Sequence, residues 1–375
     1  MSKLDHILQS IAANTANPSA TIRSEMERTG KKAVGCMLEF CPEELIYAAG
    51  MLPVGLWSGD VDPALARQYF PAFFCAPIQS SLELALRGTF DGVLSAVVVP
   101  ILCDALKSAG QNWRISVPQI PMIPIVYPQN RKLEAGRNFL RYELLDVRKR
   151  LEEVCGHSIE DEAITKAIDL YNHYRLTMQE FSAVAPHHAD VITPSVRHSV
   201  FQASFFQDKK DYMELVKELV EELKKIPEVT GERRVALTGI ALDAPGVLRV
   251  MDQQGLTVVL DTLAQESGQV DTLVPDGEDP FARMAAWWAE MRCSSLAMDD
   301  QKDRVTQMVT LAKEGKTDGV IITAPAFCDP EEYDYPIFHS ALEEAGVHHI
   351  YLEMTDHGAA EQAASRLQAF SELLD

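Results

Sequence analysis

The chain has 375 residues, 47% of them hydrophobic and 7% aromatic, values typical of a globular protein with two domains. Acidic residues outnumber basic ones by 55 to 34, giving a formal net charge of -21, and no cluster of lysine and arginine suggests nucleic-acid binding. No apolar run is long enough for a membrane span, and the N-terminus lacks the apolar stretch of a secretory signal. We therefore expect a cytoplasmic protein that binds neither nucleic acid nor membrane.

Strands and helices alternate in the first part of the chain, after a helical lead-in over residues 1–30. The segment CPEELIYAAG (41–50) predicts a helix, because Pro42 suits a first turn and Gly50 suits a helix end. MLPVGLW (51–57), residues 93–99 and PMIPIVYP (121–128) predict strands, and residues 78–87 predict a helix. We assign 31–140 to a first α/β domain with a doubly wound parallel sheet.

The pattern then changes to helices and returns to α/β. Residues 141–228 carry apolar side chains at helical spacing and predict a helical connector, broken at APHHAD (185–190) and TPSV (193–196). Strands are predicted after it at RRVALTGI (233–240), LTVVL (256–260), DGVIITA (318–324) and HHIYLEM (348–354). We assign 229–375 to a second α/β domain. The fold class is α/β, with two similar flavodoxin- or Rossmann-like domains bridged by helices.

Two distant segments share one pattern. DGVLSAVVVPILCD (91–104) and DGVIITAPAFCDP (318–330) both begin with Asp-Gly, continue with β-forming apolar residues and reach Cys-Asp. They predict equivalent strands of two related halves, each with a cysteine just beyond the carboxyl end, where open α/β sheets bind ligands. A shared fold with cysteines there by chance is the alternative. The matched cysteines favour a shared site.

Seven cysteines without a secretory signal indicate reduced thiols, not a disulfide framework. Cys36 and Cys41 have C-x4-C spacing but no second pair, which is a weak metal signal. Cys155 and Cys293 are interpreted as structural. The remaining thiols could hold a metal cluster between the domains, from three loops: Cys75, Cys103 and Cys328.

Other catalytic and nucleotide motifs are absent or incomplete. EGKTDG (314–319) contains Gly-Lys-Thr but precedes a strand and lacks the first P-loop glycine. TGIALDAPG (238–246) lacks the glycine pattern of a dinucleotide site. The histidine pairs 187–188 and 348–349 are adjacent residues without the spacing of helical metal ligands, and we interpret them as structural or solvated.

Five segments carry a resemblance to a known family. They are GKKAVGCMLEFCPEELIYAAGMLPVGLW, YFPAFFCAPIQSSLELALRG, LCDALKSAGQNW, YPQNRKLEAG and FCDPEEYDYP. The chain resembles the smaller (β) subunit of the 2-hydroxyacyl-CoA dehydratases, which are related to the benzoyl-CoA reductases. The resemblance implies a heterodimer with a homologous α subunit, each subunit holding a [4Fe–4S] cluster by three cysteines. The positions that match those ligands are Cys75, Cys103 and Cys328.

The same resemblance implies the chemistry. A homodimeric iron–sulfur ATPase, the activator, would deliver one electron transiently, and the cluster of this chain would relay it to the α subunit. There the acyl-CoA substrate would lose water through a ketyl radical, in a syn-type dehydration to the 2-enoyl-CoA. No catalytic residue is therefore assigned to this chain. The missing P-loop agrees with ATP hydrolysis on a separate protein.

Some points differ from the family or stay open. TAPAF (323–327), Gly268 after AQES, and EMTDHG (353–358) depart from the usual pattern, which puts the surroundings of the cluster in doubt but removes no ligand. The non-cysteine fourth ligand and the particular 2-hydroxyacyl-CoA are not determined.

Two other readings of the chain are possible, a subunit of benzoyl-CoA reductase type and a structural or assembly paralogue without a cluster. Arg114, Arg131 and Lys132 are candidates for contact with CoA phosphates or the partner, although exposed basic residues are more often only solvated.

Overall fold

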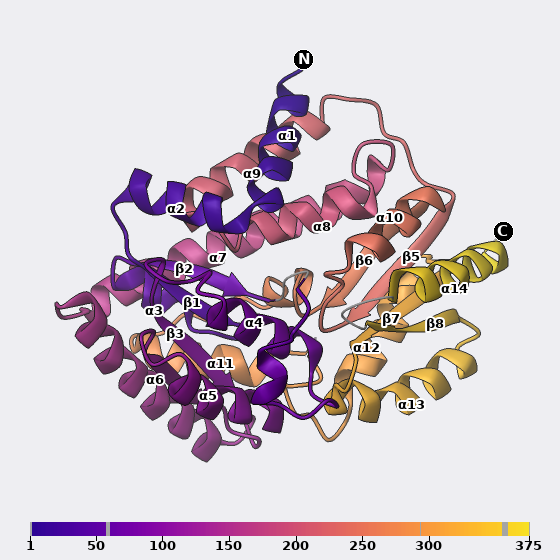
Figure 1. Ribbon diagram of the computed structural model, residues 1–375. Helices are drawn as coiled ribbons and strands as arrows, with labels where there is room; N and C mark the ends of the chain where they lie inside the picture. Colours follow the sequence, from indigo (N-terminus) through magenta and orange to yellow (C-terminus); the bar gives the residue numbers. More distant parts are fainter. Residues whose placement is uncertain (1, 58–60, 293, 355–358, 375) are drawn as a thin grey trace.

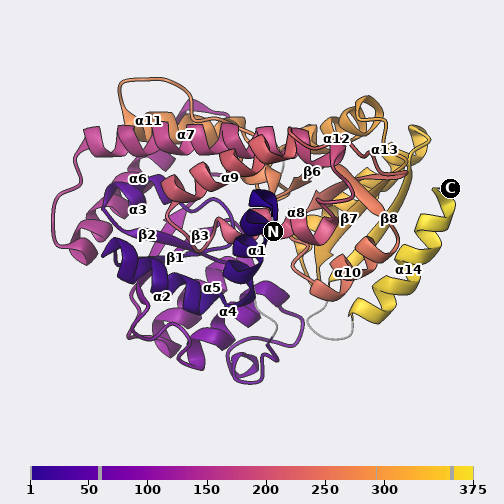
Figure 2. The same ribbon diagram turned by 90° about the horizontal axis from the view of Figure 1, so that it is seen from above.

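The computed structural model describes residues 2–57, 61–292, 294–354 and 359–374. Within these ranges two sheets of four parallel strands lie on opposite sides of the molecule, with helices around and between them (Figures 1 and 2). The helices α7, α8 and α9 run between the two sheets (Figure 1). The predicted fold class, two similar α/β domains bridged by helices, is confirmed.

The first sheet has the strand order β2-β1-β3-β4. Its strands are β1 (Ala33–Met37), β2 (Leu52–Leu56), β3 (Leu94–Ile101) and β4 (Met122–Val126). Its helices are α3 (Glu43–Ala48), α4 (Ala76–Leu86) and α5 (Asp104–Ser116), with a 3₁₀ turn at Ala66–Gln68. Both central strands are continuous apolar runs because helices cover both faces of a parallel sheet. Gly55 allows β2 to approach the connector, since a Cβ there would lie 2.8 Å from the Phe205 side chain.

The second sheet repeats this order as β6-β5-β7-β8. Its strands are β5 (Arg233–Gly239), β6 (Leu256–Leu263), β7 (Gly319–Pro325) and β8 (His348–Met354). Its helices are α10 (Pro245–Gln253), α12 (Asp303–Glu314), α13 (Asp329–Glu344) and α14 (Ala359–Leu373), with a 3₁₀ turn at Ser267–Gln269. The two segments with the shared pattern form β3 and β7, the third position in each sheet. They are therefore equivalent strands, as predicted.

The connector consists of α6 (Glu134–Cys155), α7 (Asp161–Val184), α8 (Pro194–Ala203) and α9 (Lys209–Leu223), with a 3₁₀ turn at Ala185–His187. TPSV, expected as a break, is the start of α8: the Thr193 hydroxyl accepts from the Val196 N–H, and Pro194 occupies the first turn. The lead-in forms α1 (Lys3–Ala16) and α2 (Pro18–Thr29), and α1 packs on α8 and α9.

One helix of the second half packs on the first. The helix α11 (Pro280–Glu290) contacts α6, and its Trp288 belongs to the same apolar core as β1 and β3. Residues from both predicted domains thus share one core, while the boundaries at 140, 228 and 229 remain predictions. No helix in the described part of the chain is long and apolar enough to cross a membrane.

Candidate functional site

Each of the three predicted cluster cysteines is the residue directly before a helix. Cys75 precedes α4, Cys103 follows β3 and precedes α5, and Cys328 follows β7 and precedes α13. The Leu106 N–H in the first turn of α5 donates to the Cys103 sulfur at 3.4 Å. A helix N-terminus favours negative charge, so all three positions suit a thiolate.

Cys328 lies within electrostatic reach of the other two thiols. Burial raises the pKa of Cys328 well above its ordinary value, and negative charge on Cys75, Glu331 and Cys103 raises it further. The pKa of Cys103 is also raised, mainly by burial, although N–H groups of α5 lower it. Two thiols come from the first half and one from the second. The three cysteines lie 28 to 253 positions apart in the sequence, and the fold brings Cys75 and Cys103 within electrostatic reach of Cys328.

This set of donors fits a multi-iron cluster. Thiolates in a buried pocket repel one another, and iron ions would compensate that charge. Among the described residues, the group of side chains close enough to hold a single metal ion is His339, Glu343 and His349. The three cysteines do not form such a group. A [4Fe–4S] cluster, in contrast to a single ion, binds each thiolate to a separate iron. The assignment of Cys75, Cys103 and Cys328 as ligands remains a prediction.

Glu39 is a buried residue of this site that the sequence interpretation missed. It follows β1, its Oε1 accepts from the Ser294 hydroxyl at 2.8 Å, and its Oε2 has no hydrogen-bond partner. Burial raises its pKa to about 8. A negative charge on Glu39 raises the pKa of Cys103. Its position directly beyond the carboxyl end of a central strand was the available signal.

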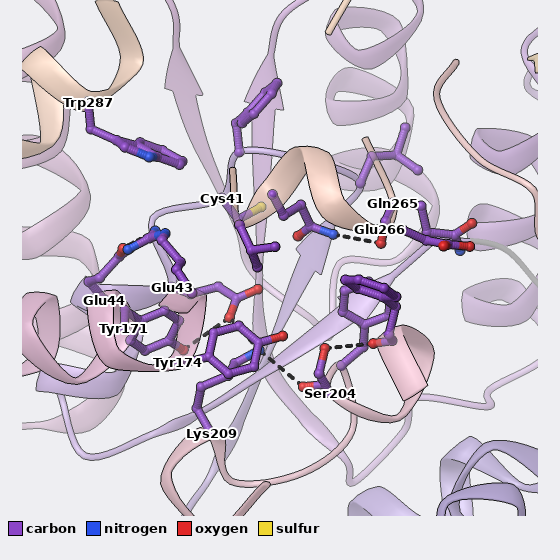
Figure 3. A pocket seen from close by; sticks show the side chains of 17 residues that line it. Cys41, Glu43, Glu44, Tyr171, Tyr174, Ser204, Lys209, Gln265, Glu266 and Trp287 are labelled. Atoms are coloured by element: carbon purple, nitrogen blue, oxygen red, sulfur yellow. Dashed lines mark hydrogen bonds and ion pairs between the residues drawn. The ribbon is translucent and has the colours of Figure 1, made fainter. Parts of the chain in front are cut away.

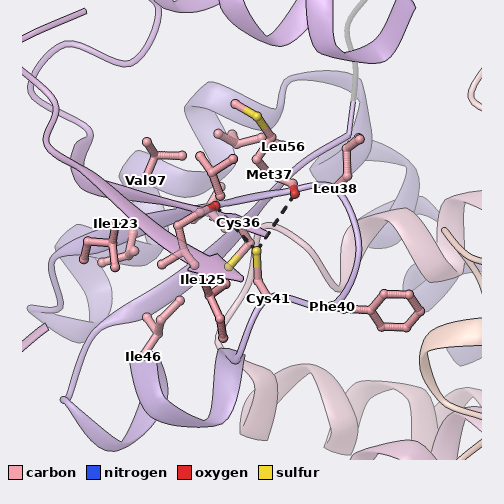
Figure 4. Packing of buried hydrophobic residues seen from close by; sticks show 14 of the residues in the cluster. Cys36, Met37, Leu38, Phe40, Cys41, Ile46, Leu56, Val97, Ile123 and Ile125 are labelled. Carbon is pink, nitrogen blue, oxygen red and sulfur yellow. Dashed lines mark hydrogen bonds between the residues drawn. The ribbon is translucent and has the colours of Figure 1, made fainter. Parts of the chain in front are cut away.

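The remaining cysteines are not part of this group. Cys36 and Cys41 pack in the core of the first half, where the Cys41 thiol contacts the Val98 carbonyl at 3.6 Å (Figure 4). Burial raises the pKa of Cys36 well above its ordinary value. Cys155 ends α6, and its thiol donates to the His157 carbonyl at 3.3 Å. Cys293 lies outside the described residues. The weak metal signal of Cys36 and Cys41 is thus explained by core packing.

A polar cavity of about 40 Å³ lies between the loop after β1 and the connector (Figure 3). Its charges are paired internally: Lys209 Nζ lies 3.1 Å from Glu43 Oε2, and Arg175 Nη2 lies 2.6 Å from Glu44 Oε1. The Tyr171 hydroxyl also donates to Glu43 at 3.0 Å. Such a volume holds a few water molecules but no acyl-CoA. The cavity is therefore part of the structural framework.

The segment AQES belongs to an ionic network at the end of β6. Glu266 accepts from the Arg197 guanidinium, and its Oε1 lies 2.8 Å from His198 Nδ1. Arg197 also pairs with Asp261. All these groups are buried. Gly268, which follows AQES, is buried in the 3₁₀ turn that comes directly after Glu266.

The basic residues considered for CoA contact have other partners. Arg131 is almost fully buried and donates to the carbonyls of Trp288, Ala289 and Met298 at 2.8 to 3.1 Å. Lys132 pairs with acidic residues at the start of α12. Arg114 is exposed in the last turn of α5. The expectation of a solvated residue is thus wrong for Arg131, which hydrogen-bonds to the last turn of α11.

A surface hollow of about 350 Å³ adjoins the cysteines. Its lining includes Phe74 and Ala76 on either side of Cys75, and Phe327 before Cys328. Phe327 is the last residue of TAPAF and is 48% exposed. Of EMTDHG, only Glu353 and Met354 at the end of β8 lie within the described residues. The departure at TAPAF therefore changes the surface beside the cysteines.

The chain is similar over its whole length to known proteins. The family model described as 2-hydroxyglutaryl-CoA dehydratase, D-component, matches residues 39–374. The chain is 41% identical over 377 residues to the (R)-phenyllactyl-CoA dehydratase beta subunit of Clostridium sporogenes. It is 38% identical over 378 residues to the lactoyl-CoA dehydratase subunit beta of Anaerotignum propionicum. Each alignment covers 100% of both chains. It is 35% identical to the (R)-2-hydroxyglutaryl-CoA dehydratase, subunit beta, of Acidaminococcus fermentans, over 96% of this chain and 97% of that one. The chain belongs to the 2-hydroxyglutaryl-CoA dehydratase, D-component family.

Proposed function

We propose that this chain is the beta subunit of a 2-hydroxyacyl-CoA dehydratase. The observation that carries the proposal is its full-length similarity, at 35 to 41% identity, to three proteins named as beta subunits of such dehydratases. Their substrates differ, so the acyl group is left open. The proposal includes a homologous alpha subunit as partner and a transient ATP-dependent activator.

Within this proposal Cys75, Cys103 and Cys328 hold a [4Fe–4S] cluster. When bound, the cluster would supply reversible one-electron storage at low potential. The protein's own contribution would be to supply three thiols from both halves and to stabilise their negative charge with three helix N-termini. Cys75 and Cys328 are buried, and Cys103 is half-buried. Glu39 adds a buried carboxyl group whose negative charge raises the pKa of Cys103.

The exposed apolar residues near the cysteines support contact with the alpha subunit at this face. Phe73 is 69% exposed and Phe327 is 48% exposed, each within two residues of a cluster cysteine. Exposed aromatic side chains beside a hollow are typical of protein interfaces. An electron relayed between subunits requires such proximity. We therefore assign this face to the alpha subunit.

The proposal is tested by counting iron and acid-labile sulfide on protein co-expressed with its paralogous subunit under strictly anaerobic conditions. We expect about eight of each per heterodimer, of which about four belong to this chain. Cys328→Ser should lose the cluster, because one of three protein ligands is removed. Cys155→Ser is the matched control, since that thiol lies outside the group and its loss should leave iron unchanged.

Turnover then tests the reaction. With activator, ATP and a 2-hydroxyacyl-CoA, catalytic amounts of electrons should support dehydration. Electron consumption in proportion to product would instead indicate a reductase. Iron-free protein that still folds and assembles would overturn the cluster assignment and favour the structural paralogue.

A further inference from the structure

A second group of potential metal ligands lies between α13 and β8, far along α13 from Cys328. His339 and Glu343 are four residues apart on α13, so they project from one face of the helix. His349 on β8 faces them, and its Nε2 lies 2.8 Å from His339 Nδ1. Donor atoms of these three residues all lie within 4.8 Å of one another. They form a compact set of two imidazoles and one carboxylate.

The hydrogen bonds of His349 orient it as a ligand. Its Nδ1 lies 3.1 Å from the carbonyl oxygen of Val347. A carbonyl only accepts, so Nδ1 carries the hydrogen and Nε2 presents its lone pair to His339. Metal-binding histidines characteristically donate their other N–H to such an acceptor. The backbone therefore holds the His349 ring in the tautomer that binds a metal through Nε2.

The surrounding packing keeps the two elements in register. Tyr335, one turn before His339, lies against Tyr351 of β8 with ring centroids 4.3 Å apart. The rings of His339 and His349 are 5.0 Å apart. Glu343 is exposed, and its Oε1 lies 4.0 Å from His349 Nδ1, so its flexible side chain can turn toward the shared point. The packing of α13 on β8 thus positions the two histidines, while the side chain of Glu343 can adjust.

We propose that His339, Glu343 and His349 bind a divalent transition-metal ion, with Zn²⁺ as the best fit. Two imidazoles and a carboxylate suit zinc, and a water molecule would complete a tetrahedral shell. The ion would take the place of the hydrogen between His339 Nδ1 and His349 Nε2. The proton of His339 Nδ1 passes to the solvent while His339 Nε2 takes one up, so that His339 stays neutral and binds the ion through Nδ1. The bound ion fixes α13 to the edge strand β8. The site is separate from the predicted cluster cysteines.

The test measures zinc binding to the full chain, purified anaerobically with its partner subunit. Equilibrium dialysis against Zn²⁺ buffered with nitrilotriacetate, followed by elemental analysis, gives the bound zinc per chain. We expect one tightly bound zinc, and at least a tenfold loss of affinity in His339→Ala and in Glu343→Gln. Both side chains are exposed, so the variants should fold. Zinc should raise the melting temperature of the wild type but not of these variants.

Two controls separate this site from others. His348→Ala removes the neighbouring histidine, which is not one of the three grouped donors, and should keep full zinc binding. Cys328→Ser should also keep it, which excludes zinc captured by the cysteines. Equal zinc affinity in wild type, His339→Ala and Glu343→Gln would overturn the proposal. So would the absence of bound zinc at micromolar free concentration.

Discussion

Backbone strain occurs beside two residues of the candidate site. Leu38 and Phe40, on either side of Glu39, have φ of 57° and 63°, and Phe327 before Cys328 has φ of 61°. A left-handed conformation costs a residue with a side chain roughly 1 kcal/mol or more. Such angles persist only where the surroundings fix them. The fold therefore holds Glu39 and Cys328 in defined positions at the carboxyl ends of β1 and β7.

His198 should make stability depend on pH. Its buried ring lies between Glu266 and Asp243, and although burial lowers its pKa, these carboxylates raise it from 6.5 to about 9. The folded state thus holds the proton more tightly than the unfolded state. This stabilisation is complete below pH 6.5 and is lost as the pH rises through 9.

We therefore expect the free energy of unfolding to fall between pH 6.5 and 9, by at most about 1.4 kcal/mol per pH unit. Urea unfolding at several pH values measures the slope. His198→Asn keeps a donor toward Glu266 but cannot titrate, so its slope should be smaller. His157→Asn, at an exposed histidine, is the control. An unchanged slope in His198→Asn would contradict the assignment.

At the scale of elements, a buried ion pair connects α12 to the helix that begins after Cys328. Arg304 on α12 donates two hydrogen bonds of 2.9 Å to the carboxylate of Glu331 on α13. Its Nη1 also lies 3.3 Å from Asp334 Oδ2. These side chains are at most 6% exposed. The pair therefore sets the position of α13 relative to the rest of the second half.

Arg304→Met should destabilise the protein by about 3–5 kcal/mol, because it leaves buried carboxylates without their cation. Denaturant unfolding measures the loss. The double variant Arg304→Met/Glu331→Gln should recover part of it, since one uncompensated charge is removed. Arg150→Met, which breaks an exposed pair with Asp146, should change stability by less than about 0.5 kcal/mol. Equal effects of the two arginine variants would refute the argument.

At the scale of the whole molecule, Arg131 joins the end of the first sheet to α11 from the second half. It donates to the carbonyl groups of Trp288 and Ala289 in the last turn of α11 and of Met298 beyond it. Its guanidinium carbon lies 5.7 Å from the centroid of the Trp288 ring. Because Trp288 packs against Phe40 and Tyr127, this contact connects both halves around the loop that carries Glu39.

Arg131→Met should therefore cost roughly 3 kcal/mol or more, because buried carbonyl groups lose their donors. Lys132→Met is a control at the next position, where an exposed pair is worth about 0–1 kcal/mol. Thermal and denaturant unfolding of both variants gives the comparison. If Lys132→Met were the more damaging change, the role assigned to Arg131 would be wrong.

The sequence pattern alone predicted the elements and their repetition. Runs such as 93–99 and 318–324 predicted parallel strands because side-chain periodicity and β propensity act over a few neighbouring residues. The repeated Asp-Gly and Cys-Asp segments also indicated equivalent strands, which the matching orders β2-β1-β3-β4 and β6-β5-β7-β8 confirm. The break predicted at TPSV is the end of a non-helical stretch, because Thr193 is extended and Pro194 begins the next helix.

Contacts between distant residues depended on the folded chain. Nothing local in the sequence indicates that Arg131 would be buried at α11 or that His349 would meet α13. The residues of one helix or strand are placed by short-range geometry, so their sequence reveals them. The partners across elements are selected by topology and packing over the whole molecule, and only the three-dimensional arrangement identifies them.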